Sequence, residues 1–509
     1  MSERVNVRAQ VMVWYPERVL TYDSVARTIV KYERIVLIDP LPDDVFLEIF
    51  DFFCLYDFTE YPVQRMKWLI LAHVCQRWRR IIFASPRRLD LYLSCICGTP
   101  VKRNLVIWPR ILPLVVHCPG PIPFCNPTPS DDDNIITALT HANHVHSVKI
   151  NVTSSLFRKV AKVMQKPFPV LTHLDLTWFP KDGTGRSPVL PWGFLGGSAP
   201  RLEFLYLSGV SFPRLPTLLL SASNLLTLRL DDILQSIPPQ TMAAGLAVLT
   251  RLSTLSLEFN KVISPLDEWE TCSNHPMPTM LPALTLFQYH GYSEYLEDLL
   301  VLINTPLVKT IKITYFVEDI QVPQLSRFIS RTNTFKDARF KSAYVDFSRD
   351  EVEVILNPGR QGKSRANITP TLLGPWSDVV KMLGCRQLIA MFSNVGHLST
   401  HGSGSEWGDM TGLDSIEWLP FFRLFPAVEK LHIYGDAAPY IASALKNIPE
   451  VMLTEVMPAL HLLWLDKEKR RRGDKPIGSI KRFLSLRQLS GHPVTVVNTY
   501  DEFKANRRH

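Results

Sequence analysis

The sequence predicts an α/β protein in which a small N-terminal helical domain precedes a curved solenoid, with parallel strands inside and helices outside. Two observations predict this fold. Short motifs in which apolar and polar residues alternate recur between residues 145 and 465, and segments of helical character lie between them. Near the N-terminus, the blocks 41–53 and 71–82 have the spacing of two short helices. A chain of 509 residues is long enough for both parts.

The composition is that of an ordinary globular protein. Apolar residues make up 46% of the chain and charged residues 20%, which excludes disorder throughout its length. Charge or proline interrupts the apolar runs before the roughly 18 residues of a membrane helix. The first residues lack the pattern of a secretory signal, so we expect a cytoplasmic or nuclear protein. The net charge of +8 favours acidic partners but does not by itself indicate nucleic-acid binding.

The first helical block opens with the features of a helix N-terminus. Pro42 fits the first turn, where its missing N–H costs nothing, and Asp43 and Asp44 lie near the positive end of the helix dipole. Two adjoining faces of the predicted helix are apolar. One consists of Val45, Ile49, Phe52 and Phe53, and the other of Phe46 and Phe50.

The second block repeats this amphipathic pattern over residues 71–82. Its polar side carries Gln76 and several arginines. Its apolar stripe consists of Leu71, Val74, Cys75 and Trp78. Two short helices with this much apolar surface need a partner to cover it.

The two blocks resemble the F-box. The resemblance is carried by Leu-Pro-Asp-Asp-Val at 41–45, Leu-Glu-Ile-Phe at 47–50 and Val-Cys-x-x-Trp-Arg at 74–79, and 82–91 is similar to the form common in basidiomycete fungi. In that family the F-box binds a Skp-type adaptor of a cullin-RING ubiquitin ligase. The resemblance implies that the adaptor contacts Leu41, Pro42, Val45, Ile49, Phe50, Val74, Cys75 and Trp78. The spacer 54–68 is longer than is usual in the family and contains Pro62.

The sequence divides the chain into five regions. They are a poorly ordered lead (1–34), the F-box region (35–93), a proline-rich linker (94–134), the repeat solenoid (135–490) and a basic tail (491–509). Because prolines cluster in the linker, it is predicted to be extended and free of helix, with one short strand at Val115–Val116.

A motif of the form L-x-x-L-x-L, with other apolar residues in some positions, recurs through the solenoid region. Nine copies are recognised, at 145–150, 171–176, 202–207, 225–230, 252–257, 284–289, 308–313, 428–433 and 460–465. Up to residue 313 they begin 23 to 32 residues apart, close to the period of about 20 to 29 residues of a leucine-rich repeat. Each copy predicts a strand, and segments such as 156–164 and 295–303 predict the helices between them.

Alternate residues of each predicted strand point to opposite faces of the sheet. One copy cannot bury its inner row alone, so stacked copies share one core. The outward residues combine aromatic rings with charges of both signs, a composition suited to protein recognition. They include Asp175, Ser256, Glu258 and Lys430. The candidates for substrate contact are Phe204, Tyr206, Arg229, Asp231, Lys312, His432 and Tyr434.

This part of the chain resembles the irregular leucine-rich repeats of many F-box proteins. The asparagine expected after the strand is present at Asn260 and replaced in most other copies. Between 340 and 427 the pattern blurs, with 395–400 as one further candidate strand. The segment 483–496 is similar to the ending of the same fungal family.

Two short patterns have features of catalytic motifs. Residues 357–364 end in the Gly-Lys-Ser of a phosphate-binding loop, but Asn357 replaces the first glycine and no helix is predicted after Ser364. Residues 402–408, near His397 and His401, lack the Gly-x-Ser-x-Gly spacing of a hydrolase. We interpret both patterns as loops and expect neither an enzyme nor a cofactor.

Two groups of residues have the chemistry of metal ligands. They are the histidines His141, His144 and His146, and the group Cys95, Cys97, His117, Cys118 and Cys125. Neither has the spacing of a zinc site, so we interpret them as surface histidines and buried thiols. The basic run 469–472 is interpreted as a solvated loop, with a nuclear-import signal or an acidic-partner contact as the alternatives.

The resemblance therefore implies a substrate-recognition adaptor. The F-box would bind a Skp-type adaptor and through it a cullin, and the repeats would hold an unidentified protein substrate close to the ubiquitin-conjugating enzyme. The alternative is a repeat scaffold that has kept an F-box without a ligase role, which the long spacer 54–68 favours. We expect neither a membrane nor nucleic acid as a partner.

Overall fold

A computed structural model describes most of the chain. The described residues are 40–55, 68–85, 89, 92–95, 101–107, 112–118, 129–179, 187–233, 237–260, 278–316, 323–332, 340–347, 351–358, 367–373, 392–402, 415–434, 438–465 and 476–498. The predicted lead 1–34, most of the spacer 54–68 and the basic run 469–472 lie outside them. The chain divides into two compact units, Met1–Leu91 and Tyr92–His509.

In the first unit, helix α2 (Asp43–Leu55) begins where the sequence predicts a helix start. The Pro42 carbonyl accepts hydrogen bonds from the backbone N–H groups of Val45 and Phe46, at 3.1 and 3.3 Å. Asp43 and Asp44 occupy the first turn, where their negative charge stabilises the helix dipole. The side chains that the helix buries are Phe46, Leu47 and Phe50.

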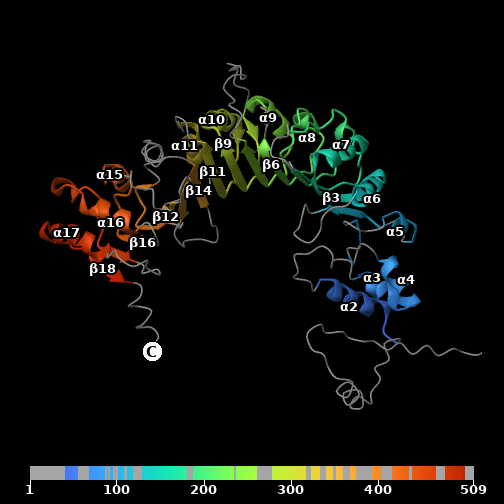
Figure 1. Cartoon of the computed structure of the whole chain (residues 1–509), viewed down its shortest axis with the longest axis horizontal. Coiled ribbons are helices and arrows are strands. Elements are labelled where there is room, and N and C mark those ends of the chain that lie inside the picture. Colours follow the sequence, from blue (N-terminus) through green and yellow to red (C-terminus); the bar gives the residue numbers. More distant parts are fainter. Residues whose placement is uncertain are drawn as a thin grey trace, which may run out of the picture. The chain divides into compact units, whose positions relative to one another are not determined.

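The second block forms two helices, α3 (Trp68–Val74) and α4 (Gln76–Ala84), which corrects the prediction of one stripe over 71–82. Cys75 between them has an extended backbone, and its Sγ accepts a hydrogen bond from the Trp78 N–H at 3.4 Å. The thiol thereby caps the N-terminus of α4. It accepts from the Trp78 N–H, which in a continuous helix would donate to the carbonyl four residues earlier. Helices α2, α3 and α4 pack against one another (Figure 1).

The proline-rich segment 94–134 contains regular structure, so the prediction of an extended linker is wrong. It holds α5 (Val101–Ile107), β2 (Leu114–Cys118) and the start of α6 (Pro129–Thr140). Its prolines flank these elements: Pro100 precedes α5, and Pro129 is the first residue of α6, where a missing N–H costs no hydrogen bond. The strand predicted at Val115–Val116 is confirmed as part of β2.

This segment belongs to the sheet of the second unit. β1 (Leu93–Cys95) pairs in parallel with β2, and β2 pairs in parallel with β3 (Val145–Val152).

All nine motif copies coincide with strands. Besides β3, they are β4 (His173–Trp178), β5 (Phe204–Ser208), β6 (Thr227–Ile233), β7 (Thr254–Phe259), β9 (Leu286–Gly291), β11 (Thr310–Phe316), β16 (Lys430–Ile433) and β17 (Leu462–Leu465). Except in β3, the strand starts two residues after the first apolar residue of the motif. That first residue, such as Leu202 or Leu225, lies in the preceding turn and is fully buried.

Among the described residues, sixteen strands form one sheet. β1 to β7, then β9 and β11, follow one another in chain order, and each pairs in parallel with its neighbour. The connections contain α7 (Ser154–Val163), η2 (Phe194–Gly197), α8 (Leu215–Leu219), α9 (Pro239–Leu246), α10 (Ser293–Leu302) and α11 (Pro323–Arg331). Figure 1 shows these helices along one side of the strands, and α8 to α11 pack in sequence. β8 (Thr279–Met280) and β10 (Ile303–Asn304) form a separate small sheet.

The middle of the sheet departs from this regular order. β12 (Phe340–Phe347), β13 (Glu351–Pro358) and β14 (Asn367–Leu373) pair antiparallel, and the sheet order becomes β11-β14-β13-β12-β15. The candidate strand 395–400 is confirmed as β15 (His397–Gly402), which pairs in parallel with β12. These antiparallel strands explain why the motif blurs between 340 and 427.

The last part returns to parallel pairing. α15 (Ser415–Arg423), α16 (Ala438–Lys446) and α17 (Pro476–Leu489) pack in sequence beside β16 and β17, and η6 (Glu450–Met452) follows α16. β18 (Thr495–Asn498) pairs with β17, so the predicted basic tail 491–509 contributes a strand.

A buried cation joins helix α17 to the chain before β17. The Arg487 side chain of α17 has no exposed surface. Its Nη1 donates to the Leu453 carbonyl at 2.9 Å, and its Nη2 donates to the Leu460 carbonyl at 2.8 Å and to those of Met457 and Pro458 at 3.5 and 3.4 Å. The guanidinium therefore ties α17 to the chain between η6 and β17.

The inner row of the sheet is apolar and closed to solvent. It includes Leu174, Leu205, Leu228, Leu255, Ile311 and Leu431, none of which is exposed. The chain is thus a mixed α/β protein with a large, mainly parallel sheet and helices, as the sequence predicts. Within the part that is described, no helix combines the length and the apolar character needed to cross a membrane.

Candidate functional site

Helices α2 and α3 expose a set of apolar side chains. Ile70 is 63% exposed and Ile49 is 46% exposed. The other exposed members are Val45, Phe52, Phe53 and Val74. Exposed apolar side chains gathered on so short a stretch are typical of a protein-interaction surface. We call Val45, Ile49, Ile70 and Val74 the apolar helical surface.

Buried aromatic rings support this surface from within. The Trp78 ring of α4 lies 5.6 Å from the Phe46 ring and 4.9 Å from the Phe50 ring, centroid to centroid. Phe50 has no exposed surface, so it stabilises the packing and offers nothing for a partner to contact. Trp78, which the sequence also predicts to contact the adaptor, is half-buried between α2 and α4.

Arg77 joins the start of α2 to α4. Its Nη2 lies 2.8 Å from Asp43 Oδ1 and donates a hydrogen bond of 2.6 Å to the Leu41 carbonyl. Its guanidinium also lies over the Phe46 ring, at 4.8 Å. The sequence places Arg77 on the solvated side of the second block, and nothing in the local pattern indicates this contact. Of the remaining predicted residues, Pro42 and Cys75 are exposed and Leu41 is half-buried.

The outward face of the sheet aligns side chains from neighbouring strands. One row runs through successive register partners in β3, β4, β5, β6, β7, β9 and β11: Lys149, Asp175, Tyr206, Arg229, Ser256, Gln288 and Lys312. It contains three of the predicted substrate-contact residues, Tyr206, Arg229 and Lys312. The sequence places them on the same face, and the register places them in one line.

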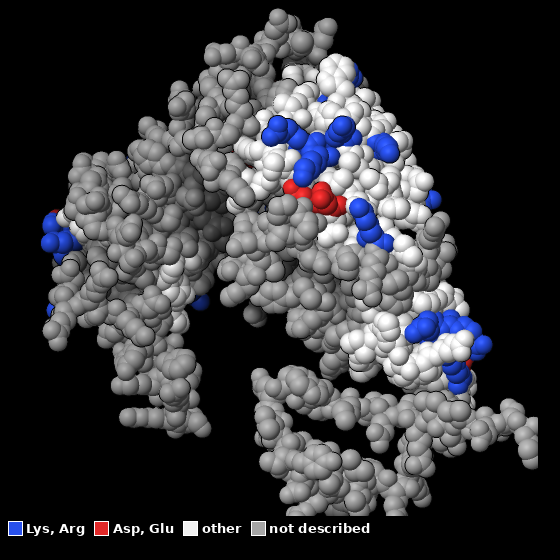
Figure 2. All heavy atoms as spheres, turned by 45° about the vertical axis from the view of Figure 1, so that its right-hand side comes forward, with Lys and Arg blue, Asp and Glu red and all other residues white. Residues whose placement is uncertain are grey.

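Most charges along β3 to β9 are paired with a neighbour. Lys149 Nζ lies 3.4 Å from Asp175 Oδ2. Arg229 Nη2 lies 3.6 Å from Asp231 Oδ2, and His290 Nδ1 lies 3.4 Å from Glu258 Oε1. We call these six residues the paired-charge surface. Figure 2 shows a group of acidic side chains bordered by basic ones on the face that it presents.

Burial and pairing shift the pKa values of these carboxyl groups in opposite directions. Asp175 is only 6% exposed, and burial raises its pKa although Lys149 acts to lower it. Burial likewise raises the pKa of Asp231. The pKa of Glu258 is lowered, chiefly by its hydrogen bond with His290.

Two predicted contact residues on this part of the sheet are already engaged with neighbours. Phe204 stacks on His173 with ring centroids 4.0 Å apart. Tyr206 lies under the Arg229 guanidinium at 5.2 Å. A partner would therefore meet a surface whose side chains are held in place.

A second cluster lies on β12, β15, β16 and β17. His432 stands at its centre, with the Tyr434 ring at 3.7 Å and the Trp464 ring at 5.4 Å. His432, a predicted substrate contact, is only 9% exposed, because neighbouring rings cover it. The cluster, which we call the ring surface, consists of Tyr344, His397, His401, His432, Tyr434 and Trp464. Sequence reasoning missed Tyr344, His397, His401 and Trp464 as members of this surface, although their alternate positions in the strands were a usable signal.

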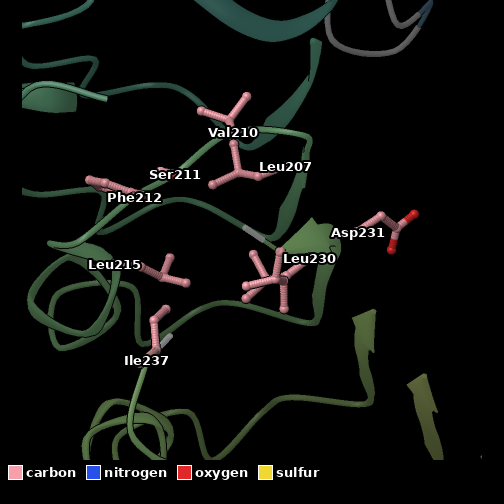
Figure 3. A pocket seen from close by; sticks show the side chains of 9 residues that line it. Leu207, Val210, Ser211, Phe212, Leu215, Leu230, Asp231 and Ile237 are labelled. Carbon is pink, nitrogen blue, oxygen red and sulfur yellow. The ribbon is translucent and has the colours of Figure 1, made fainter. Parts of the chain in front are cut away.

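One cavity lies beneath the sheet, where β5 and β6 meet their connections. Its volume is about 20 Å³, which is close to the space for a single water molecule. It is lined by Leu207, Val210, Ser211, Phe212, Leu215, Leu230, Asp231, Ile233 and Ile237. Figure 3 shows the Asp231 carboxylate directed away from the apolar lining. The cavity is thus a packing gap and too small for an organic ligand.

An open polar depression of about 490 Å³ lies beside the turns that follow α6 and α7. Its lining includes His141, His144 and Lys166. The third histidine of that predicted group, His146, lies on β3, where its Nε2 is 3.1 Å from Thr172 Oγ1. Among the described residues, no three His, Cys, Asp or Glu side chains are gathered so that they could hold a metal ion.

The cysteine group of the sequence is only partly described. Cys95 and Cys118 are buried on β1 and β2, and burial raises the pKa of Cys95 to about 12. Cys97 and Cys125 lie outside the described residues.

The phosphate-loop pattern 357–364 follows β13 and precedes β14. Because β14 is a strand antiparallel to β13, the helix that a phosphate-binding loop requires does not follow it. Residues 359–366, and residues 403–408 of the second pattern, lie outside the described part of the chain.

The site therefore comprises two kinds of surface: an apolar one on helices and a polar, aromatic one on a sheet. Both are suited to binding macromolecules. Comparison with known proteins finds no family model and no curated protein that matches this chain.

Proposed function

We propose that this protein is a substrate-recognition adaptor of an SCF-type ubiquitin ligase. In this proposal the helices α2, α3 and α4 form an F-box that docks on a Skp-type adaptor, and the outward face of the sheet binds a protein substrate. The observation that carries the proposal is the apolar helical surface, because Val45, Ile49 and Val74 of it lie in the F-box-like motifs at 41–50 and 74–79.

The composition of this surface supports docking. Val45 and Ile49 lie on α2, Ile70 and Val74 on α3, and all four are exposed. Burying such side chains against a partner contributes about 1.5 to 3 kcal/mol for each one that is fully covered. The buried Phe46 and Phe50 rings and the half-buried Trp78 ring hold the helices together, so little conformational entropy is lost on docking.

The arrangement of the second unit supports a leucine-rich-repeat solenoid. Its motif copies are strands, their order in the sheet follows the chain from β1 to β7, and helices connect them on one side (Figure 1). Each strand pairs only with its neighbours, which is the nearest-neighbour stacking of repeat proteins. Such a sheet presents a long row of outward side chains to a substrate.

The proposed mechanism is proximity. The ligase would hold a substrate lysine beside the charged ubiquitin-conjugating enzyme and so raise its effective concentration. This chain would contribute binding and orientation.

A Ser–His contact on β15 offers a catalytic alternative. Ser399 Oγ lies 3.4 Å from His397 Nε2 on β15. Burial and the charge of Lys430 lower the pKa of His397, whereas a catalytic dyad needs a carboxylate that orients the imidazole and stabilises its charged form. The register partners of His397 are Ser342 on β12 and Lys430 on β16, and neither is acidic, so this contact supports a binding role better than a hydrolytic one.

The decisive experiment is co-purification of the full chain with a Skp-type adaptor. We expect the wild type to bind, and we expect Val45→Asp and Ile49→Asp to weaken binding at least about tenfold, because each places a charge in an apolar contact. Leu220→Asp is the matched control, since Leu220 is exposed directly after α8 in the other unit. Well-folded wild-type protein that does not bind would sink the proposal.

Trp78→Ala tests whether the Trp78 ring acts by stabilising the helices and not by contacting the adaptor. It removes the ring that packs on Phe46 and Phe50, and we expect it to destabilise the first unit by about 3 to 5 kcal/mol and to abolish docking through unfolding. Circular dichroism and limited proteolysis would distinguish this loss from the loss in Val45→Asp, which should stay folded.

The second candidate is a repeat scaffold with a vestigial F-box. The observation that favours it is the length of the spacer 54–68, which includes Pro62. Shortening this spacer should restore adaptor binding if the spacer blocks docking, and leave binding absent if the helices have lost the contact surface.

A further inference from the structure

The ring surface differs in charge from the rest of the outward sheet face. β4, β6 and β7 carry Asp175, Asp231 and Glu258 on that face, whereas β15, β16 and β17 contain no acidic residue. At the β12 border of the ring surface, Asp346 is the register partner of His401. Lys430 of β16 is exposed and forms no ion pair among the residues that the structure describes. This section of the sheet therefore offers a cation that the fold leaves available.

The rings add hydrogen-bond donors to this cation. Trp464 is half-buried and has an indole N–H, and Tyr434 and His401 are half-buried with an O–H and imidazole nitrogens. A carboxylate accepts hydrogen bonds from all of these groups, so the surface is complementary to negative charge. The aromatic faces also provide area against which an aliphatic or aromatic side chain can pack.

The surface is preorganised by contacts among the rings. The Tyr434 and Trp464 rings are tilted against His432, and the His397 ring lies nearly parallel to it with centroids 6.5 Å apart. His401 extends the cluster to Tyr344, at 6.3 Å. Rings held in this way lose little side-chain entropy when a partner binds.

We propose that the ring surface with Lys430 is the docking subsite for an acidic peptide segment of the substrate. This inference rests on the proposed function, because it names the chemical class of substrate for the same sheet face. Carboxylates of the segment would pair with Lys430 and accept hydrogen bonds from Trp464 and Tyr434. Its apolar side chains would pack on the rings.

Single-stranded nucleic acid is the other class of partner that binds aromatic, cationic surfaces. The observations favour the peptide. β15, β16 and β17 together contain one lysine and no arginine, whereas a phosphate backbone is bound by several cations. The central ring, His432, is covered by its neighbours and has no free face on which a base could stack.

The test uses the full chain and a labelled peptide of repeating Glu-Tyr, with repeating Lys-Tyr as the charge-reversed control. Fluorescence anisotropy would measure the dissociation constants. We expect saturable binding of the acidic peptide only. Lys430→Glu should weaken it at least about tenfold, because like charges would then face each other. Trp464→Ala should weaken it about tenfold through the lost aromatic contact.

The matched control is Lys446→Glu, which makes the same charge change at the exposed end of α16. It should leave binding unchanged. Equal weakening by Lys446→Glu would show a general charge effect and overturn the proposal, as would failure of the wild type to bind. Because Lys430 is exposed, its variant keeps the test informative even if Trp464→Ala fails to fold.

Two further measurements separate the hypotheses. Tighter binding of an oligothymidylate, weakened by the same two variants, would assign the surface to nucleic acid and overturn the peptide. Adaptor co-purification without peptide binding would overturn this inference alone. Peptide binding without adaptor co-purification would overturn the proposed function and leave an acidic-peptide receptor.

Discussion

The paired-charge surface and the ring surface lie on the same sheet but place their charged side chains differently. On β3 to β9, basic side chains pair with carboxylates, across neighbouring strands for Lys149–Asp175 and His290–Glu258 and within β6 for Arg229–Asp231. On β15 to β17, rings stand outside, and a cation, Arg487, lies inside, held by backbone carbonyls. A parallel sheet fixes only which row faces out, so each section is free to present a different chemistry.

Because the charges are placed differently, mutations in the two sections should lower the stability of the fold by different amounts. An exposed ion pair contributes little to stability because water screens it. A buried cation that donates to several carbonyls contributes more, since its removal leaves buried acceptors without donors. The following predictions use this contrast, from the largest effect to the smallest.

Arg487→Met should have the largest effect. It removes the donors of the Leu453 and Leu460 carbonyls, and we expect the C-terminal part of the sheet to lose about 3 kcal/mol of stability. Hydrogen exchange of the β17 and β18 amides would measure the loss locally. Arg482→Met on the same helix is the control: Arg482 is exposed and its ion pair with Glu450 is 3.8 Å long. If both variants behaved alike, the buried cation would have no special role.

His432→Ala should have an intermediate effect. The ring packs against Tyr434 and Trp464, and its loss should cost about 1 to 2 kcal/mol. Urea unfolding of the variant against His461→Ala, whose side chain is exposed next to β17, would isolate the contribution of stacking. Equal stability of the two variants would contradict the view that the rings form one packed surface.

Lys149→Met should have a small effect. Lys149 is half-exposed, so the loss of its ion pair with Asp175 should cost less than about 1 kcal/mol at neutral pH. Without Lys149, which lowers it, the pKa of Asp175 should rise further. A raised carboxyl pKa favours the protonated folded form, so the cost should shrink as the pH falls. A cost that grows on acidification would contradict this interpretation.

At neutral pH the Phe204–His173 stack should give the weakest signal, because His173 is then mostly uncharged in both the folded and the unfolded chain. Burial, with smaller contributions from Lys149 and His146, lowers the pKa of His173 from 6.5 to about 4. Between these values the unfolded chain binds more protons, so the free energy of unfolding should fall as the pH drops from 6.5 towards 4. His173→Gln should flatten this slope in urea titrations at several pH values. An unchanged slope would assign it to other groups.

The sequence predicted the strands well because their signal is local. In copies such as 202–207 and 252–257, alternating apolar residues identify a strand and its inner row without knowledge of its neighbours. The strand at 115–116 was found for the same reason. The antiparallel pairing of β12, β13 and β14 is not predicted, although these strands are close in the chain, because they lie where the repeat motif blurs.

The wrong predictions for the proline-rich segment 94–134 and for the helix around Cys75 also have a physical cause. Proline forbids a helix interior but is favourable at its first turn, so clustered prolines marked the ends of α5 and α6 instead of excluding them. The break at Cys75 depends on a thiol acting as an N-cap, a role usually taken by Ser, Thr, Asp or Asn.

By itself, the sequence determined the fold class, the strands with their inner and outer rows, and the apolar blocks of the first unit, because hydrophobic periodicity is a property of neighbouring residues. Only the tertiary structure decided which outward side chains meet. The contact of Arg229 with Tyr206, the packing of His432 against Trp464, and the enclosure of Arg487 by carbonyls all join residues from different parts of the chain. Such contacts are set by strand register and helix packing, which bring distant residues together.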